Sequence, residues 1–272
     1  MYYKGIDVAK WQGIIDWSKV KSQIDFAILK VTKKNNDKEE SFERNYSGCI
    51  SNGIPVGVYR YVYARNKKEA EAEAEGILKA IKGKVIACKV WLDLEDNSIK
   101  KIGRSKLTEV IETEAKILQN NGYEVGIYSN PNWYNNVLDS GYLRTKYPFW
   151  IARYPKLDRG KLNIDSSLNP KDYAIAWQYS SKGKVNGING NVDLDVAFEP
   201  LWKAPDIKQE EYFPQYLGNS QSIANTLNAM GFDGSFDNRK KIAIKNGITG
   251  YKGTYAQNVQ LMKLLKEGKL KK

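Results

Sequence analysis

The stretch VWLDLED, residues 90 to 96, carries the acids best spaced for chemistry. It begins as an apolar strand and ends with Asp93, Glu95 and Asp96. Residues i and i+2 of a strand point to the same face, with α-carbons roughly 6.5–7 Å apart, so Asp93 and Glu95 are expected to lie together. Neighbouring buried carboxylates disfavour each other's ionisation, and one then keeps a proton near neutral pH. Such a pair can break a glycosidic bond. Asp96 faces away and is expected to be a turn residue.

Three further acids are expected near this pair. Functional groups of a β/α barrel gather at the C-terminal ends of its strands. Asp7 lies on the first predicted strand, and Asp193 and Asp195 lie on the eighth. Strands one and eight are neighbours in a closed barrel, and strand four lies across the mouth. The acids are therefore expected to face one another over a cleft.

Aromatic and polar side chains lie on the last halves of the other strands. Flat rings stack on sugar faces, while Tyr, Gln and Arg side chains hydrogen-bond to hydroxyl and acetamido groups. A single ring is more often a core residue, and a D-x-E pair alone is a weak signal. Together they predict a polysaccharide-binding cleft. The predicted substrate-binding residues are Tyr59, Tyr61, Tyr128, Trp150, Arg153, Trp177 and Gln178.

The chain contains no histidine and only two cysteines. The lack of histidine excludes Ser-His and Cys-His nucleophile systems and every metal site with histidine ligands. Acid–base chemistry near neutral pH therefore falls to carboxylates. We expect no metal and no cofactor. Cys49 and Cys88 make no disulfide framework and are expected to be buried free thiols.

Short β-type segments alternate with helical patterns along the first two thirds of the chain. The predicted strands are 4–9, 26–32, 56–63, 89–95, 124–129, 148–154, 173–180 and 191–198. The predicted helices are 40–52, 67–81, 106–122 and 130–138. Alternating units imply an α/β fold with a parallel sheet, and eight strands imply closure into a TIM-like barrel. The barrel is expected to be irregular, because the last strands lack clear helices between them. A doubly wound open sheet is the alternative, but no phosphate-binding loop supports it.

Composition divides the 272 residues into three parts. Residues 1–202 hold the predicted barrel. Residues 203–211 are polar, include Pro205 and predict a linker. Residues 212–272 are predicted to form a small, mainly helical module. Its apolar residues at helical spacing are Ile223, Leu227, Met230, Val259, Met262 and Leu265.

The net charge of +12 favours polyanionic partners such as nucleic acid, anionic lipid or wall polymers. No recognised nucleic-acid-binding motif accompanies the charge, so we expect no nucleic-acid partner. The sequence contains no run of 18 apolar residues, so it predicts no membrane span. The N-terminal MYYKGIDVAKW has no apolar stretch typical of a signal peptide.

The sequence resembles the glycoside hydrolase family 25 lysozymes, which are N-acetylmuramidases, of the kind found in clostridial phage endolysins. The stretches that carry the resemblance occur in family order over nearly all of residues 1–198: GIDVAKWQG, IDWSKVKSQIDFAILKVT, GVYRYVYA, VWLDLED, VGIYSNPNWY, FWIARYP, IAWQYS and VDLDVAF. The family's fold is an irregular β/α barrel whose last strands lack helices. Its four acidic positions fall on Asp7, Asp93, Glu95 and Asp193.

The resemblance implies a role for each of these four acids. Glu95 is implied to be the general acid that protonates the leaving oxygen. Asp93 is implied to stabilise the cationic intermediate or to orient the substrate's acetamido group. Asp7 and Asp193 are implied to tune charge and to place sugar or water.

Two departures from the family pattern suggest a changed cleft rim. Arg60 stands where many relatives have histidine after the tyrosine of the third strand. KKNND, residues 33–37, replaces the usual acidic-glycine ending of the second strand. All four acids are nevertheless present.

Residues 212–272 are similar to C-terminal modules of clostridial cell-wall hydrolases, especially in NRKKIAIKNGI, GTYAQN and LLKEGKLKK. This similarity implies binding to peptidoglycan or to anionic wall polymers. The alternative is a merely structural or oligomerising role, so self-association through this module stays open. A phage lysin of this kind is expected to wait in the host cytoplasm and to act on the wall after release.

Three functions remain open from the sequence. The first is an enzyme that cuts β-1,4 bonds after N-acetylmuramic acid in peptidoglycan. The second is a hexosaminidase of different bond specificity. The third is a non-catalytic wall-binding protein that kept the barrel shape, against which the complete set of acids argues.

Overall fold

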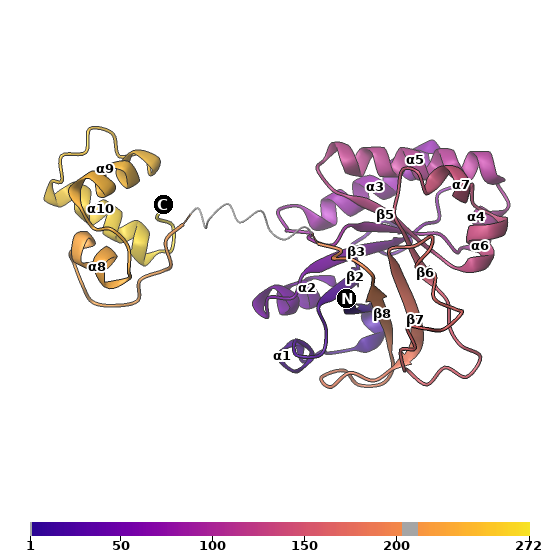
Figure 1. Cartoon of the computed structure of the whole chain (residues 1–272). Coiled ribbons are helices and arrows are strands. Elements are labelled where there is room, and N and C mark those ends of the chain that lie inside the picture. The colour runs from indigo at the N-terminus through magenta and orange to yellow at the C-terminus, as the bar shows by residue number, and fades with distance from the viewer. Residues whose placement is uncertain (1, 203–211) are drawn as a thin grey trace. The chain divides into compact units, whose positions relative to one another are not determined.

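The computed structural model describes residues 2–202 and 212–272, which belong to two compact units, Met1–Ala204 and Pro205–Lys272 (Figure 1). Each unit has its own hydrophobic core. The predicted linker, residues 203–211, lies outside the described residues.

Eight strands close into a barrel in sequence order, which confirms the predicted fold. Each strand lies within or beside its predicted segment, because short apolar runs mark buried strands locally. The strands are β1 (Tyr3–Val8), β2 (Phe26–Lys30), β3 (Val56–Tyr61), β4 (Val90–Asp93), β5 (Val125–Ser129), β6 (Phe149–Ala152), β7 (Ala176–Gly183) and β8 (Val192–Ala197).

The last strand departs from the predicted parallel sheet. Strands β1 to β7 run parallel, but β8 pairs antiparallel with both β7 and β1. The short connection Lys184–Asn191 between β7 and β8 explains this, since a parallel return needs a crossover of a dozen or more residues. Consequently the N-terminal end of β8, not its C-terminal end, lies beside the C-terminal end of β1.

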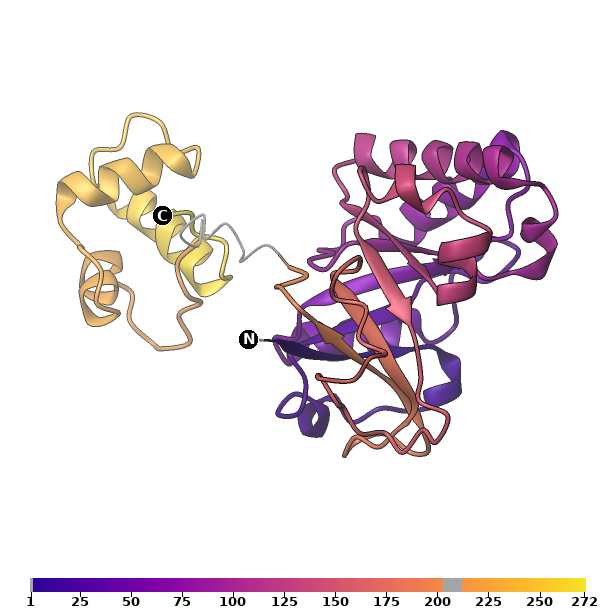
Figure 2. The ribbon, with the colours of Figure 1, turned by 45° about the vertical axis from the view of Figure 1, so that its right-hand side comes forward.

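Helices cover the outside of the barrel between its early strands. They are α1 (Trp17–Val20), α2 (Phe42–Ser51), α3 (Lys67–Ile81), α4 (Asn97–Lys100), α5 (Arg104–Asn120), α6 (Pro131–Asn136) and α7 (Ser140–Leu143), after a 3₁₀ turn, η1 (Lys10–Gln12). Helices α3 and α5 pack side by side, and loops cover the side formed by β7 and β8 (Figures 1 and 2). Across the described parts of the chain, we find no helix with the length and apolar character needed to cross a bilayer.

Large rings fill the inside of the barrel below its mouth. Phe26, Trp91 and Trp150 are all buried there, and the rings of Trp91 and Trp150 lie 5.6 Å apart. Glycines on neighbouring strands make room for them. A Cβ atom at Gly126 would lie 2.4 Å from the Trp91 ring. The rings form a solid floor under the side chains of the mouth.

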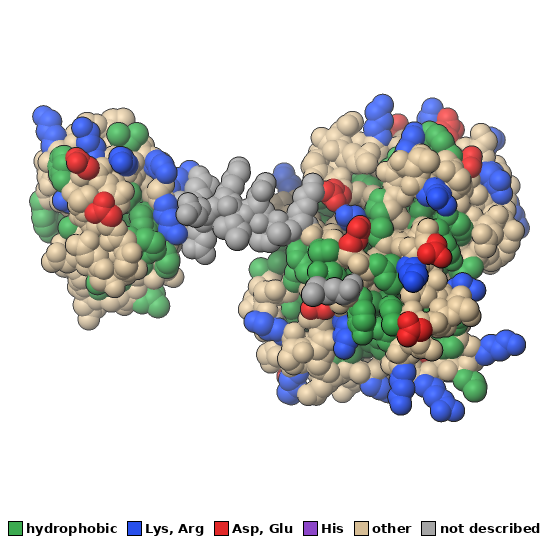
Figure 3. Space-filling model, in the orientation of Figure 1, with side chains coloured by type: hydrophobic (Ala, Val, Ile, Leu, Met, Phe, Trp, Pro, Cys, Tyr) green, Lys and Arg blue, Asp and Glu red, His purple; other side chains and the backbone are tan. Residues whose placement is uncertain are grey.

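The C-terminal unit is helical, as predicted. It contains α8 (Ile223–Ala229), α9 (Phe236–Lys245) and α10 (Tyr255–Lys266). Ser222, Ser235 and Thr254 cap their N-termini by accepting backbone hydrogen bonds. Of the apolar residues identified from spacing, Ile223, Leu227, Met262 and Leu265 are buried, whereas Val259 is 42% exposed and Met230 is partly buried. Lysine and arginine side chains outnumber acids on the face seen in Figure 3.

Candidate active site

A cleft of about 320 Å³ opens at the C-terminal ends of the parallel strands. Each acid of the predicted catalytic set contributes to its lining. So do five of the seven predicted substrate-binding residues. The lining residues are Asp7, Lys30, Tyr59, Tyr61, Asp93, Glu95, Tyr128, Trp150, Tyr154, Gln178, Ser181 and Asp193.

Asp7 is held in a hydrogen-bonded network on one side of the cleft. It is only 6% exposed, and Gln178 Nε2 donates to its Oδ2 over 2.6 Å. The Tyr128 hydroxyl donates to Gln178 Oε1 over 2.9 Å, and the Tyr154 hydroxyl donates to the same atom. The amide of Gln178 is thereby oriented with its NH₂ group toward Asp7. Asp7 is thus held in place by side chains of β7, β5 and the segment that follows β6.

Asp93 and Glu95 come from the end of β4. Asp93 is the last residue of the strand, 4% exposed, and its register partners are Tyr61 and Tyr128. Its Oδ1 is buried and receives no hydrogen bond from the described residues. Glu95 lies beyond the strand, although we predicted a strand through residue 95. The Leu94 amide still donates to the Tyr128 carbonyl at 2.9 Å, so the extended backbone continues and both acids reach the same cleft.

Burial raises the pKa of every acid in the cleft, and repulsion by neighbouring acids adds to the shift for Asp7, Asp93 and Asp193. Burial raises the pKa of Asp93 well above its ordinary value, and Glu95 adds to the shift. Burial also raises the pKa of Glu95, while the Lys30 ammonium opposes that shift. Burial, Asp195 and Asp193 raise the pKa of Asp7. Burial, Asp158 and Glu95 bring the pKa of Asp193 to about 6. Carboxyl groups of this kind can keep protons for acid catalysis at neutral pH.

Asp195 and Asp96, the remaining acids from the sequence, lie outside the cleft lining. Asp195 is 1% exposed, and Trp150 Nε1 donates to its Oδ1 at 3.0 Å beneath the mouth. Trp150 itself is 1% exposed, so it forms part of the cleft floor rather than an open stacking platform. Asp96 is the N-cap of α4 and accepts from the Ser98 amide, in agreement with the predicted turn role.

Trp177 and Arg153 do not line the cleft, contrary to the sequence prediction. Trp177 alternates with Gln178 on β7, so its ring points out of the barrel. There it is 2% exposed, packs 5.9 Å from the Tyr179 ring and donates to the Arg153 carbonyl. The Arg153 guanidinium reaches the Leu168 carbonyl in the loop that follows β6. Only one of two adjacent strand residues can face the cleft, and here it is Gln178.

The sequence reasoning missed Lys30, Tyr154 and Ser181. Lys30 ends β2 on the same face as Phe26 and Ile28, and it lies 5.7 Å from the Tyr59 ring and 5.8 Å from the Tyr61 ring. The same alternation that identified the acids would have identified Lys30. Tyr154 and Ser181 lie at irregular positions, where local periodicity carries no signal.

The two departures from the family pattern contact each other behind the cleft. The Arg60 side chain is 1% exposed and points away from the barrel interior, toward α3, where it forms an ion pair with Glu73 at 2.9 Å. Arg60 also donates to Thr32 Oγ1 at 3.0 Å and to Asn36 Oδ1 at 2.7 Å. Neither departure lines the catalytic cleft. They organise the loop beside it.

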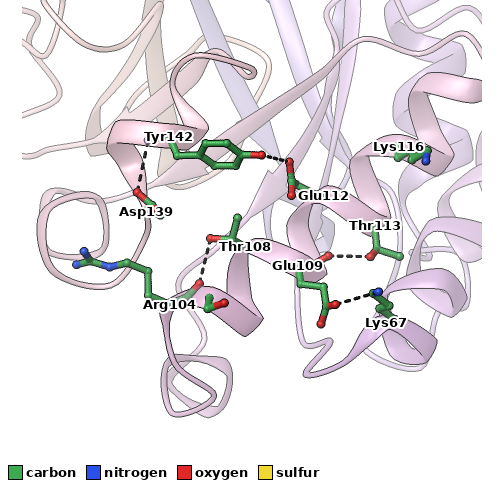
Figure 4. A pocket seen from close by; sticks show the side chains of 10 residues that line it. Lys67, Arg104, Thr108, Glu109, Glu112, Thr113, Lys116, Asp139 and Tyr142 are labelled. Atoms are coloured by element: carbon green, nitrogen blue, oxygen red, sulfur yellow. Dashed lines mark hydrogen bonds and ion pairs between the residues drawn. The ribbon is translucent and has the colours of Figure 1, made fainter.

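A larger groove of about 770 Å³ lies on the outer face of α3, α5 and α7 (Figure 4). Two of its glutamates are engaged with neighbouring side chains. Glu109 pairs with Lys67 at 2.9 Å, and Glu112 accepts from the Tyr142 hydroxyl at 2.8 Å. These acids are exposed and paired, so they lack the buried, converging arrangement of the cleft. Within residues 2–202 and 212–272, no group of three or more His, Cys, Asp or Glu side chains is arranged to hold a metal ion.

Comparisons with known proteins indicate the family of the chain. The sequence profile of Glycosyl hydrolases family 25 matches residues 6–188. An autolytic lysozyme of Clostridium acetobutylicum is 32% identical over 201 residues, which are 73% of this chain and 56% of that protein. The chain thus spans just over half the length of that relative. The crystal structure of a bacterial lysozyme from Streptomyces coelicolor superposes with a TM-score of 0.60 at 28% identity, covering 72% of this chain and 92% of that one.

A third relative has a different enzymatic class. An L-alanyl-D-glutamate peptidase of a Listeria phage is 45% identical over 51 residues, which are 19% of this chain and 18% of that protein. The matched stretch is shorter than the barrel and comparable in length to residues 212–272.

Proposed function

Because the chain belongs to glycosyl hydrolases family 25, we propose that it hydrolyses the glycan strands of bacterial peptidoglycan. The observation that carries the proposal is the pair Asp93 and Glu95, two acids of raised pKa at the end of one strand. They share their cleft with Asp7, Asp193 and several tyrosines. The proposed bond is the β-1,4 linkage between N-acetylmuramic acid and N-acetylglucosamine, as the lysozyme names of its relatives suggest.

Glu95 is the proposed general acid. It is half-buried, so it is open to substrate while its pKa stays raised. A glycosidic oxygen leaves poorly as an alkoxide, and a proton from Glu95 removes that difficulty. The Glu95 carboxylate formed in this step is stabilised by the nearby Lys30 ammonium.

Asp93 is the proposed stabiliser of positive charge on the sugar. The transition state of glycoside hydrolysis resembles an oxocarbenium ion. Positive charge developing on the sugar lowers the raised pKa of Asp93 and favours its ionised form. An ionised carboxylate in a buried site attracts that charge more strongly than one in water. The unpaired Oδ1 of Asp93 is available for this contact or for the substrate's acetamido N–H. Asp7, fixed by Gln178, and Asp193 then position sugar hydroxyls and the attacking water.

Residues 212–272 are the proposed wall-targeting module. They form a separate helical unit with a basic surface, and bacterial walls carry carboxylates and anionic polymers. A peptidase cuts peptide bonds, whereas this chain is proposed to cut glycosidic bonds, so the two enzymes share no chemistry. A 51-residue stretch common to both is therefore better explained by attachment to a target than by catalysis.

The deciding experiment digests purified clostridial peptidoglycan and identifies the sugar at the new reducing ends, with Glu95→Gln treated in parallel. Reducing muramic acid made only by the wild type would support the proposal. Reducing glucosamine would keep the glycosidase and overturn the bond specificity. An absence of new reducing ends would instead favour a non-catalytic wall-binding protein.

A further inference from the structure

A second hollow of about 330 Å³ lies beside the catalytic cleft. The two are joined by a pair of tyrosine rings. Tyr61 lines the cleft, Tyr63 lines the hollow, and their ring centroids are 4.9 Å apart with an interplanar angle of 37°. A polymer bound in the cleft can therefore extend a substituent over this pair without leaving the surface. The hollow is lined by Lys34, Asn36, Tyr63, Arg65, Glu69, Ala72, Glu73 and Ser98.

The loop that carries Lys34 and Asn36 is held from behind by Arg60. This buried guanidinium donates to Thr32 Oγ1, to the Lys33 carbonyl and to Asn36 Oδ1. Asn36 takes a backbone φ of 67°, a left-handed conformation that asparagine tolerates better than most residues. The exposed Lys34 then extends over the Tyr63 ring, with Nζ 4.7 Å from its centroid. The loop is thus built as a rigid support for one ammonium group.

The carboxylates in and beside the hollow already have hydrogen-bond or ion-pair partners within the protein. Glu73 pairs with Arg60 and accepts from the Tyr63 amide. Glu69 accepts from the Arg65 amide at 2.8 Å and from Asn66 Nδ2 at 2.9 Å. Asp96, which also lies near Tyr63, accepts from the amide and hydroxyl of Ser98.

Some hydrogen-bond donors in the hollow, unlike its carboxylate acceptors, have no partner of this kind. No ion pair joins Lys34 to a carboxylate within the described parts of the chain. Asn36 Oδ1 accepts from Arg60, and the Asn36 NH₂ group has no hydrogen-bond acceptor among the described residues. A site with engaged acceptors and available cationic and amide donors favours a ligand rich in acceptors, above all a carboxylate.

We propose that the hollow around Lys34 and Tyr63 is a subsite for a carboxylate of the stem peptide attached to muramic acid. The Lys34 ammonium and the Asn36 amide bind the carboxylate, and the Tyr63 ring supports the adjoining peptide atoms. This subsite rests on the proposed function, since its ligand is a substituent of the glycan that the cleft is proposed to cut. It makes the enzyme prefer glycan that carries peptides over bare glycan.

The test compares two soluble polymers from the same peptidoglycan, freed from other wall polymers. One keeps its stem peptides, and the other has lost them to an amidase. The readout is the ratio of kcat/KM for the two polymers. We expect Lys34→Gln to lower the ratio by about 5–10-fold, mainly through KM, as befits one partly exposed charged contact. Lys34→Arg should keep most of the preference.

Lys116→Gln is the matched control. Lys116 is a lysine of the outer groove, on a helix outside the barrel mouth (Figure 4). It should leave the ratio at the wild-type value. The effect of Lys34→Gln should also shrink as salt is added, because an exposed ionic contact is screened.

One result would overturn the subsite while leaving the enzyme intact. Lys34→Gln would leave the ratio unchanged, whether or not both rates fall together. A wild-type protein that cuts neither polymer would overturn the proposed function, and the subsite with it. The two failures are therefore distinguished by the wild-type rates alone.

Discussion

Asp7 on β1 and Asp193 on β8 are register partners in the antiparallel pair that closes the barrel. Two acids from opposite ends of the catalytic unit thus lie side by side at its mouth. Burial, Asp195 and Asp193 raise the pKa of Asp7, and burial, Asp158 and Glu95 bring the pKa of Asp193 to about 6. The cleft therefore concentrates carboxyl groups that exchange protons near neutral pH.

Glu95→Gln should reduce kcat on purified peptidoglycan by at least about 10²–10⁴-fold, because glutamine keeps the shape of glutamate but donates no comparably acidic proton. Release of reducing ends measures the rate. Glu109→Gln, on the outer face of α5, is the matched control and should retain wild-type activity. A Glu95→Gln variant with half the wild-type rate or more would rule out the assigned role.

Asp93→Asn should be nearly as damaging to turnover while leaving the fold at least as stable. Burial raises the pKa of Asp93, so the folded state disfavours its charge, and asparagine avoids that cost. At neutral pH the variant should therefore lose activity but unfold at a temperature no lower than that of the wild type. Loss of both together would indicate a structural role for Asp93 instead.

Lys30→Met should move the alkaline limb of the kcat/KM profile to higher pH. The Lys30 ammonium lowers the pKa of Glu95 against the effect of burial. Without it, that pKa rises further and Glu95 keeps its catalytic proton to higher pH. The profile is measured alongside Lys116→Met. A limb that stays in place or moves to lower pH would contradict the role of Lys30.

Glu114→Gln should stabilise the protein at neutral pH. Glu114 on α5 is fully buried, neither of its side-chain oxygens has a hydrogen-bond partner among the described residues, and burial raises its pKa well above the ordinary value. The free energy of unfolding is not reduced by Glu114 at a pH low enough to protonate this carboxyl group in the unfolded chain as well. As pH rises from the pKa of Glu114 in the unfolded chain to its pKa in the folded protein, the free energy of unfolding falls by about 1.4 kcal/mol per pH unit.

Glutamine does not ionise, so this variant escapes the loss. Denaturant unfolding at pH 4 and pH 8 should show little difference from the wild type at pH 4 and a gain at pH 8. A variant less stable than the wild type at pH 8 would show that Glu114 is charged in the folded protein.

Residues 1–202 alone should hydrolyse soluble wall fragments but bind intact cells poorly. The barrel has its own core, so circular dichroism should show a folded product. Full-length Glu95→Gln serves as the binding control and should attach to cells like the wild type. Equal cell binding by residues 1–202 and the full chain would remove the targeting role from residues 212–272.

Much of the catalytic unit could be predicted because its signals are local. Short apolar runs mark the strands, and the acids of the cleft lie within two positions of a strand end. Asp93 and Glu95 were expected on one face because strand geometry has a period of two. The cleft lined by Asp7, Asp93, Glu95 and Asp193 assembles from those short-range patterns once the strands close in order.

Other features depend on contacts between segments far apart in the sequence. The antiparallel direction of β8 is a property of its pairing with β1 and β7, and no residue of β8 encodes it alone. Trp177 and Gln178 both suit a sugar-binding site by type, yet the register of β7 sends one ring outward and one amide inward. Arg60 is a polar residue on a strand, and only the approach of α3 with Glu73 makes it a buried support for a loop.

The elements, their order and the acids at the strand ends are thus encoded locally, because backbone periodicity and turn chemistry act over a few residues. Which side chains share the cleft, and how strongly they hold their protons, depends on long-range packing. Burial and the distance between charges set a pKa, and both arise when strands from residues 3 to 197 close around one mouth.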